Sequence, residues 1–470
     1  MADGGGGGQQ AAPAAGGVMG TLASWGGGMW NYTTSTLNSL MGFEDLDVVN
    51  PDSGQAEHGS TSDVQQLQGV DEAERQKAFT NYRDYIGMDI TSLVTLPVWI
   101  MEPFSILQTM AQIMEYNEAL DKASACEDPY ERLAWVVGFC VGTYGSLERT
   151  WKPFNPILGE TFELELENGT KFFSEQVSHH PPIGAGHGEN TNWTYDIVSA
   201  PSTKFLGNSV EIYPVGRSRI KLRKTGEEFS LVPPNTKANN VVIGRTWIDT
   251  AGEFTVLNCT SGAKCSLYFT PCGWFGSGRY EVSGHIYTEE GRKVLALAGK
   301  WNSHLDMVKC DAEGDPLPGA ETVRLWTCKP KPTDDKYGFT YFARMLNSCK
   351  GINPMPSDSR RRPDRAALEA GDNATAGAEK YALEEMQRAE RREREKRGDA
   401  WQPRWFRPNS DAKIYPIEYP PDQCPLWEFN GEALKREKRP AKPDDDFAGI
   451  DFCPWQYPEI HQYDDGTPDG

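Results

Sequence analysis

From about residue 161 to about residue 326, apolar and polar residues tend to alternate along the chain. Phe162, Leu164 and Leu166 alternate with glutamates, and Asn168-Gly169 then supplies the dipeptide of a tight hairpin turn. Similar segments follow, bounded by turn residues, without a β-α-β rhythm. Because a two-residue period buries one face of each strand, this stretch predicts an antiparallel meander that forms a sandwich or a barrel. The segments expected as strands include Val210–Val215, Ile220–Leu222, Val241–Trp247, Phe254–Leu257, Leu267–Phe269 and Val294–Ala298.

Helical patterns precede and follow these strands. Asp128-Pro129 followed by Glu131 provides an N-cap, a first-turn proline and an acidic third position, which together begin a helix. Residues 133–147 carry no charge, but this run is shorter than the ~17–25 residues of a membrane span. It therefore favours a core helix or the wall of a lipid pocket. Further helices are expected directly after Pro103, over 365–370 and over 378–396, so the sequence predicts an α+β fold, mostly antiparallel β.

The first seventy residues differ from the rest and are expected to form a tail, residues 1–70. Residues 1–17 and 50–68 are poor in bulky apolar groups and cannot offset their ordering entropy by burial. Between them, segment 18–43 has apolar residues at three- and four-residue spacing, as in a helix lying in a membrane interface. Glycines 26–28 weaken helix formation, so a disordered tail or a helix docked on the domain remains an alternative. The candidate membrane-contacting residues are Leu22, Trp25, Met29, Trp30, Leu37, Leu40 and Met41.

The composition excludes several kinds of function. The net charge is −20, which disfavours nucleic-acid binding, and an anionic ligand would have to be held by a local basic cluster. Ten cysteines are scattered without a C-x-x-C pair, so neither a zinc ribbon nor a disulfide framework is expected. We expect reduced thiols, no metal, no cofactor and, without a signal-peptide pattern, a cytoplasmic protein.

Two adjacent histidines, His179 and His180, precede two prolines that would stop further strand pairing. Each imidazole can donate a hydrogen bond to an anion and, with an ordinary pKa near ~6.5, can gain a proton when a phosphate approaches. A structural turn with surface histidines is the commoner outcome for such a pair. A metal site would need a third ligand. A nucleophilic Ser178 would need a Gly-x-Ser-x-Gly turn, which this segment lacks.

Two other clusters could supply charge to an anion site. Lys152 and Asn155 offer a cation and an amide donor on a loop stiffened by two prolines. Lys380, Glu384 and Arg388 are spaced by four residues, which places them on nearly one face of a helix. Glu384 could fix both cations for a phosphorylated polyol, although a solvated salt-bridge ladder would have the same spacing.

Taken in order along the chain, these segments resemble the oxysterol-binding-protein family. The string Glu-Gln-Val-Ser-His-His-Pro-Pro, residues 175–182, resembles the family signature and is joined by segments 150–161 and 357–365 and by the helix that carries Lys380. The resemblance covers residues 71–463 or so. It is strongest to the short plant and green-lineage members that lack a pleckstrin-homology domain, as the segments 207–210, 213–216 and 271–282 indicate.

The resemblance implies a lipid-transfer domain over residues 71–465. The implied fold is a near-complete antiparallel β-barrel that encloses a lipid tunnel, with flanking helices and an N-terminal lid over about 72–97. The lid residues would be Ile86, Met88, Ile90, Leu93 and Leu96. The head group of phosphatidylinositol 4-phosphate would be bound by Lys152, Asn155, His179, His180, Lys380, Glu384 and Arg388.

The resemblance also implies a non-enzymatic protein that exchanges this phosphoinositide for a sterol between membranes. Thr143 and Tyr144, in the uncharged helix, are candidate sterol contacts. Phosphatidylserine as the second lipid and a sensor or scaffold role are the alternatives, while a phosphatase would need a nucleophile beside the histidines. We expect a monomer that contacts endoplasmic-reticulum and Golgi-type membranes peripherally, with an endoplasmic-reticulum receptor as a candidate protein partner.

Overall fold

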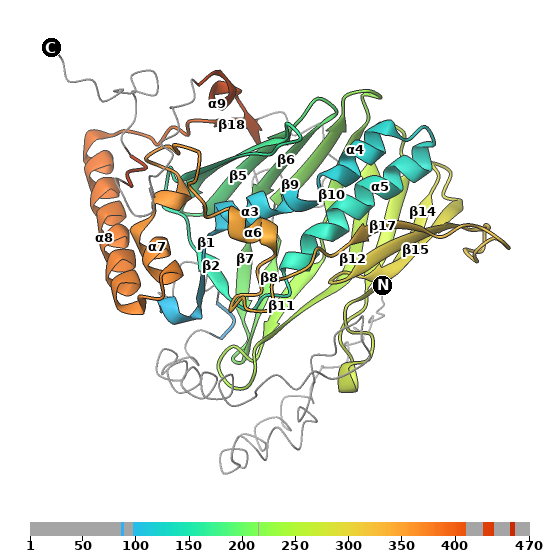
Figure 1. Ribbon diagram of the computed structural model, residues 1–470, viewed down its shortest axis with the longest axis horizontal. Helices are drawn as coiled ribbons and strands as arrows, with labels where there is room; N and C mark the ends of the chain where they lie inside the picture. The colour runs from blue at the N-terminus through green and yellow to red at the C-terminus, as the bar shows by residue number, and fades with distance from the viewer. Residues whose placement is uncertain (1–85, 89–96, 215, 410–425, 437–451, 456–470) are drawn as a thin grey trace, which may run out of the picture. The chain divides into compact units, whose positions relative to one another are not determined.

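The computed structural model describes residues 86–88, 97–214, 216–409, 426–436 and 452–455 (Figure 1). All of them belong to one compact unit, residues 62–470. The expected membrane segment 18–43 and the lid residues Ile90, Leu93 and Leu96 lie outside the described residues.

Strands dominate the described chain. They are β1 (Met101–Ser105), β2 (Lys152–Phe154), β3 (Thr161–Glu165), β4 (Lys171–His179), β5 (Pro182–Glu189), β6 (Trp193–Ser199), β7 (Ser202–Phe205), β8 (Ser209–Tyr213), β9 (Gly216–Leu222), β10 (Glu228–Val232), β11 (Asn235–Asn239), β12 (Trp247–Asn258), β13 (Lys264–Phe269), β14 (Glu281–Tyr287), β15 (Lys293–Lys300), β16 (His304–Lys309), β17 (Val323–Thr327), β18 (Phe406–Asn409) and β19 (Leu426–Phe429).

The helices are shorter elements, apart from one. They are α3 (Ile106–Gln112), α4 (Glu118–Ala125), α5 (Pro129–Gly142), α6 (Tyr341–Met345), α7 (Pro363–Glu369), α8 (Asn373–Arg397) and α9 (Glu432–Lys435), with 3₁₀ turns η3 (Val98–Ile100), η4 (Ile113–Tyr116), η5 (Thr143–Ser146), η6 (Trp274–Gly276) and η7 (Ser359–Arg361). No described helix has the length and apolar character needed to cross a membrane.

Within the described residues, fifteen strands pair into one antiparallel sheet. The order is β17-β16-β15-β14-β13-β12-β10-β9-β6-β5-β4-β3, and the short strands β7, β8 and β11 join it through β12. Most strands that are neighbours in sequence are neighbours in the sheet, because short turns connect them, as the alternating pattern predicts. The expected α+β fold with mostly antiparallel strands is confirmed (Figure 1).

Two sequence expectations are wrong. Residues 241–246 form a turn, since Asn240 and Gly244 have φ angles of 57° and 90° and the Asn208 side chain accepts the N–H groups of Val242 and Ile243. Pro103 lies in β1, and the following helix begins only at Ile106. The Ser105 hydroxyl caps this helix by accepting the N–H of Leu107 at 3.3 Å.

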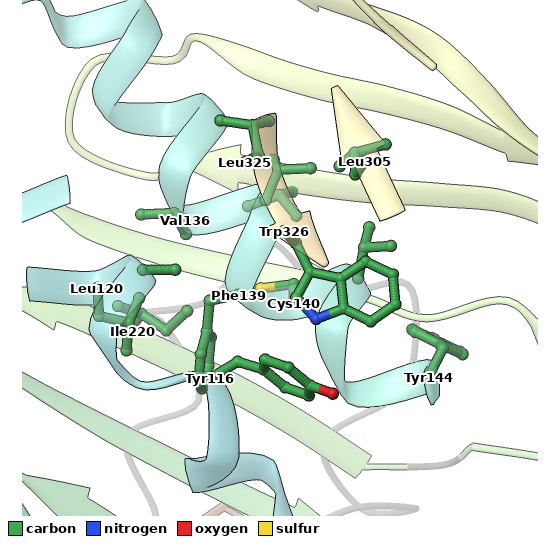
Figure 2. Packing of buried hydrophobic residues seen from close by; sticks show 14 of the residues in the cluster. Tyr116, Leu120, Val136, Phe139, Cys140, Tyr144, Ile220, Leu305, Leu325 and Trp326 are labelled. Carbon is green, nitrogen blue, oxygen red and sulfur yellow. The ribbon is translucent and has the colours of Figure 1, made fainter. Parts of the chain in front are cut away.

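Helix α5 is the central element of the main hydrophobic core. Asp128 caps it by accepting the N–H groups of Tyr130 and Glu131 at 2.8 and 3.0 Å, and Pro129 occupies its first turn. Most of its uncharged residues, from Leu133 to Gly142 apart from Trp135, are buried, as the sequence predicts for a core helix. Figure 2 shows Phe139 and Cys140 of this helix together with Trp326 of β17 and Tyr116.

The close approach of α5 to β17 depends on glycine. A Cβ added to Gly142 would lie 2.5 Å from Nε1 of Trp326. Real Cβ atoms do not come this close to another heavy atom, so a side chain here would displace the indole ring. The indole ring therefore fills the space that a side chain would take, and it packs edge-on against Tyr116 with ring centroids 5.5 Å apart.

A small cluster packs the start of the long helix α8 together with the separate parallel pair β1–β2. Val98, Met101, Phe154, Leu368 and Ala376 bury their side chains together. They come from η3, β1, β2, α7 and α8, so segments more than two hundred residues apart in sequence meet here. Asp372 begins α8 by accepting the N–H of Thr375 at 3.0 Å, and Gly398 ends it with a φ of 73°.

Candidate functional site

A cavity of about 230 Å³ opens between α8, the segment around β2 and the β4–β5 hairpin. All seven residues that the sequence predicts for the head-group site line it: Lys152, Asn155, His179, His180, Lys380, Glu384 and Arg388. Sequence reasoning missed Gln176, Arg362, Gln387 and Arg391, which also line it. The structure thus brings the predicted residues together from three separate parts of the chain.

The β4–β5 hairpin presents both histidines to the cavity. His179 is the last residue of β4 and pairs with Pro182, the first residue of β5. The two imidazole rings are edge-to-face, with centroids 4.8 Å apart. Nδ1 of His179 is buried and has no hydrogen-bond partner among the described residues, an arrangement that native proteins usually resolve with water or a ligand.

The surroundings of the cavity lower the pKa of both histidines. Burial lowers the pKa of His179 to about 4, and His180, Arg391 and Arg362 add to this effect, against a hydrogen bond to the backbone of Pro156. Burial and Arg391 also lower the pKa of His180. Desolvation and nearby like charge disfavour the protonated form, so an incoming anion would reverse the second effect.

Helix α8 lines the cavity with one face. Lys380, Glu384, Gln387, Arg388 and Arg391 follow the spacing that places side chains on a single helical stripe. The Lys380 ammonium lies 2.6 Å from Glu384, and Arg388 lies 3.5 Å from the same carboxylate. Glu384 therefore pairs with Lys380 and reaches Arg388, whose nearer partner is Glu385. Arg391 follows Arg388 by three residues and continues the same stripe of the helix, so the helical period alone could have predicted it as a site residue.

Lys152 and Asn155 line the cavity from the segment around β2. The Lys152 ammonium donates to the Asn155 side-chain oxygen at 2.8 Å. Burial, together with the nearby Lys380 and Arg362, lowers the pKa of Lys152 to about 8. A cation with a lowered pKa lacks a full counter-charge, so this wall also favours an anionic ligand.

A buried ionic network borders the cavity at Arg362. Arg362 donates to Asp364 at 2.6 Å and to Glu160 at 2.9 Å, and all three side chains are almost fully buried. Arg362 also donates to the backbone carbonyl of Asn155 at 2.9 Å, and Ser359 donates to Glu160 at 2.7 Å. The network ties the segment before α7 to the loop that carries Asn155.

Glu175 performs a similar positioning role behind the histidines. Its buried carboxylate accepts the backbone N–H groups of Arg404 and Trp405, both at 2.8 Å. Burial raises its pKa to about 7. Glu175 thus attaches the chain that follows α8 to strand β4, a long-range contact that no sequence pattern indicates.

The other predicted positions lie elsewhere. Of the lid residues, Ile86 and Met88 are exposed, and the segment between them pairs with β7 through the Gly87 N–H and the Phe205 carbonyl at 2.7 Å. Tyr144 is buried with its ring centroid 5.1 Å from that of Phe269. Thr143 donates its hydroxyl to the Cys140 carbonyl at 2.8 Å. Lid closure and sterol contact stay predictions.

Among the described residues, no group of three or more His, Cys, Asp or Glu is arranged to hold a metal ion. The lining of the cavity is instead cationic, with four arginine or lysine side chains besides Arg362 and a single carboxylate, that of Glu384. Arg362 is already balanced by Glu160 and Asp364. The arrangement suits a compact, hydroxylated anion such as a phosphorylated sugar or polyol.

Comparisons with known proteins find relatives over most of the chain. The oxysterol-binding protein family model matches residues 77–438. The chain is 44% identical to oxysterol-binding protein-related protein 3B of Arabidopsis thaliana, over 94% of this chain and 96% of that protein. It is 46% identical to protein 3C of the same plant, over 90% and 93%.

Solved structures share the fold. The Osh1 ORD domain in complex with cholesterol superposes with a TM-score of 0.67 at 30% identity, covering 86% of this chain and 95% of that chain. The Saccharomyces cerevisiae Osh3 ORD in complex with PI(4)P has a TM-score of 0.61 at 32% identity, covering 75% and 89%. The predicted barrel-like arrangement of mostly antiparallel strands with flanking helices is confirmed by these neighbours. The chain belongs to the oxysterol-binding protein family, with its strongest similarity among these proteins to the plant members.

Proposed function

We propose that this protein is a lipid-transfer protein that binds phosphatidylinositol 4-phosphate in the cationic cavity and exchanges it for a sterol between membranes. The observation that carries the proposal is the unpartnered, buried Nδ1 of His179 in a cavity that also gathers Lys152, Lys380, Arg388 and Arg391. A phosphate there would satisfy the nitrogen and the surplus of positive charge at once.

Each wall of the cavity has a distinct part in this proposal. The two histidines and Arg388 take the 4-phosphate, while Lys152, Asn155, Lys380 and Glu384 take the rest of the inositol phosphate. Glu384 accepts from a ring hydroxyl with the lone pairs that Lys380 leaves free. The network of Arg362 keeps the loop of Asn155 at a fixed distance from α8.

Two solved relatives support the choice of lipids, since the Osh3 ORD is in complex with PI(4)P and the Osh1 ORD with cholesterol. We place the protein in the cytoplasm, peripherally on endoplasmic-reticulum and Golgi-type membranes, as a monomer. Phosphatidylserine as the second lipid, or a sensor that binds without transferring, are the alternatives. A phosphatase is disfavoured because no cysteine lines the cavity among the described residues.

The deciding measurement is extraction of radiolabelled phosphatidylinositol 4-phosphate and sterol from vesicles, each with the other lipid as competitor. We expect both lipids to be extracted in about one copy per protein and to compete, since they would share one binding space. If only the phosphoinositide is extracted, the sterol assignment is wrong and phosphatidylserine is tested next. If neither is extracted, the lipid-transfer proposal fails.

Arg391 provides a residue-level test of the cavity. Its guanidinium lies near both histidines, and among the described residues its ion pair is with the exposed Glu395, at 3.4 Å, so it can turn to a phosphate. We expect Arg391→Gln to weaken binding of the soluble head group about tenfold, the loss of one charge-assisted hydrogen bond. The matched control is Arg392→Gln, which removes the same charge from the next residue, outside the cavity lining. Equal effects of the two substitutions would show that only long-range charge matters.

A further inference from the structure

The connection between β13 and β14, residues 270–280, holds two adjacent aromatic side chains in solvent. Trp274 is 84% exposed and Phe275 is 89% exposed, the largest exposures of any large apolar side chain among the described residues. Single exposed apolar residues are ordinary, but two neighbouring rings that are both almost completely exposed are not. In Figure 1 this connection, which contains η6, extends past the ends of the neighbouring strands.

Hydrogen bonds hold the loop that exposes the two rings. The Gly273 N–H donates to the Ser277 carbonyl at 2.8 Å, and the Ser277 hydroxyl donates to the Trp274 carbonyl at 3.2 Å. The Cys272 N–H donates to Asp249 on β12 at 3.0 Å. Phe275 itself has a φ of 61°, a conformation that non-glycine residues rarely adopt. Such strain persists where the surrounding structure imposes it, and it is often associated with function.

The charges around the two rings argue against a charged partner. Residues 270–278 contain no charged side chain, and the single cation of the loop is Arg279. Its guanidinium already lies over the rings of Trp247 and Tyr280, at 5.3 and 4.6 Å from their centroids. The whole chain carries a net charge of −20, which opposes approach to an anionic surface. The tip of the loop is therefore apolar and electrically neutral.

Other apolar residues are exposed at the same end of the sheet. The β7–β8 and β11–β12 turns adjoin each other, because Asn208 donates to the Ile243 carbonyl at 3.1 Å. Leu206 and Ile243 on these turns are 38% and 37% exposed. The β11–β12 turn leads directly into Trp247, on which Arg279 stacks. Leu206 and Ile243 would therefore also contact an apolar surface that the aromatic tip contacts.

We propose that Trp274 and Phe275 form a wedge that inserts into the interfacial layer of an electrically neutral phospholipid membrane. Tryptophan prefers this layer, where its ring is buried and its N–H stays hydrated. A loop that is already ordered loses little conformational freedom on insertion, so most of the gain from burying the rings is retained. The inference goes beyond the proposed ligand exchange, because it concerns the membrane surface and needs no bound ligand.

The test is flotation of the full chain with vesicles of phosphatidylcholine alone, which contain neither proposed ligand. We expect Trp274→Ser with Phe275→Ser to lower vesicle affinity at least roughly tenfold. The matched control is Tyr341→Ser with Tyr381→Ser, which removes two rings that are each 64% exposed at other sites and should change affinity less than about twofold. Binding of wild type should not weaken between about 0.05 and about 0.5 M salt, since it depends on apolar burial.

Equal vesicle binding by the wedge variant, the control variant and wild type would overturn the proposal, as would an absence of vesicle binding by wild type. Binding that requires added phosphatidylserine and disappears with salt would also overturn it in favour of an electrostatic contact. Head-group affinity in solution should be the same in the wedge variant and wild type. This second readout separates the wedge from the cavity, so that either inference can fail alone.

Discussion

Substitution of both His179 and His180 by alanine should abolish extraction of phosphatidylinositol 4-phosphate while leaving the protein folded. Each histidine would donate a charge-assisted hydrogen bond of about 1.5–3 kcal/mol to the phosphate. Loss of both bonds corresponds to a decrease in affinity of about a hundredfold or more. Neither ring is needed by the hydrophobic core, since both lie at the cavity on a hairpin. Vesicle extraction and thermal unfolding are the two measurements.

The proton balance of binding gives this prediction a second readout. Burial lowers the pKa of His179 to about 4, so this ring is neutral near pH 7 before an anion binds. A phosphate dianion in contact favours the charged form and raises the pKa of both rings. The complex then holds more protons than the free protein, so binding near pH 7 takes up protons, and affinity falls as pH rises through the raised pKa. Calorimetry of soluble head-group binding in two buffers of different ionisation enthalpy measures this uptake.

The matched control is the pair His285→Ala and His304→Ala, which removes two histidines that lie outside the cavity lining. We expect this control to extract the phosphoinositide as wild type does and to show the same proton uptake. Extraction by the His179/His180 variant within about threefold of wild type would contradict the assigned role. Head-group binding by wild type without proton uptake would contradict the protonation step alone.

The sequence predicts the sheet and the central helix well because their determinants are local. Alternation of side chains defines each strand, and Asp128-Pro129 defines the start of α5. The wrong strand at 241–246 has a local explanation too. Its apolar residues match a strand, but Asn240 and Gly244 adopt left-handed conformations that a turn requires. The turn is held by local hydrogen bonds, from Asn240 to the Arg245 carbonyl and from Thr246 to the Asn240 carbonyl, and also by the distant Asn208 side chain.

The cavity shows a second limit on what can be predicted from the sequence. Its seven predicted residues came from a family resemblance, since residues 152, 179 and 380 have no sequence proximity that would place them together. Arg391 could have been found from the period of α8. Glu175 and Arg362 could not, because Glu175 accepts from Trp405, 230 residues away, and Arg362 donates to the Asn155 carbonyl, 207 residues away. Such partners become identifiable only when the fold is known.

Arg362→Met should be the most destabilising single substitution near the cavity, with a loss of about 3–5 kcal/mol in the free energy of unfolding. The Arg362 side chain is 2% exposed and bonds to two carboxylates that are fully buried, those of Glu160 and Asp364. Methionine would preserve most of the volume but leave two negative charges together without their cation. The midpoint of urea unfolding measures the loss.

The cause of that loss can be isolated with charge-neutral partners. Glu160→Gln and Asp364→Asn, added to Arg362→Met, remove the unpaired charges and should restore a substantial part of the stability. Arg397→Met is the control, since Arg397 pairs with Asp399 on the surface.

The network also makes a prediction that links stability to function. Arg362 fixes the Asn155 carbonyl and stands at the start of α7, which packs against α8. If the network only stabilised the fold, the triple variant would regain head-group affinity together with its stability. We expect stability to return while affinity stays at least about tenfold below wild type, because the Asn155 carbonyl loses the hydrogen bond that anchors it. Full recovery of both would assign the network to folding alone.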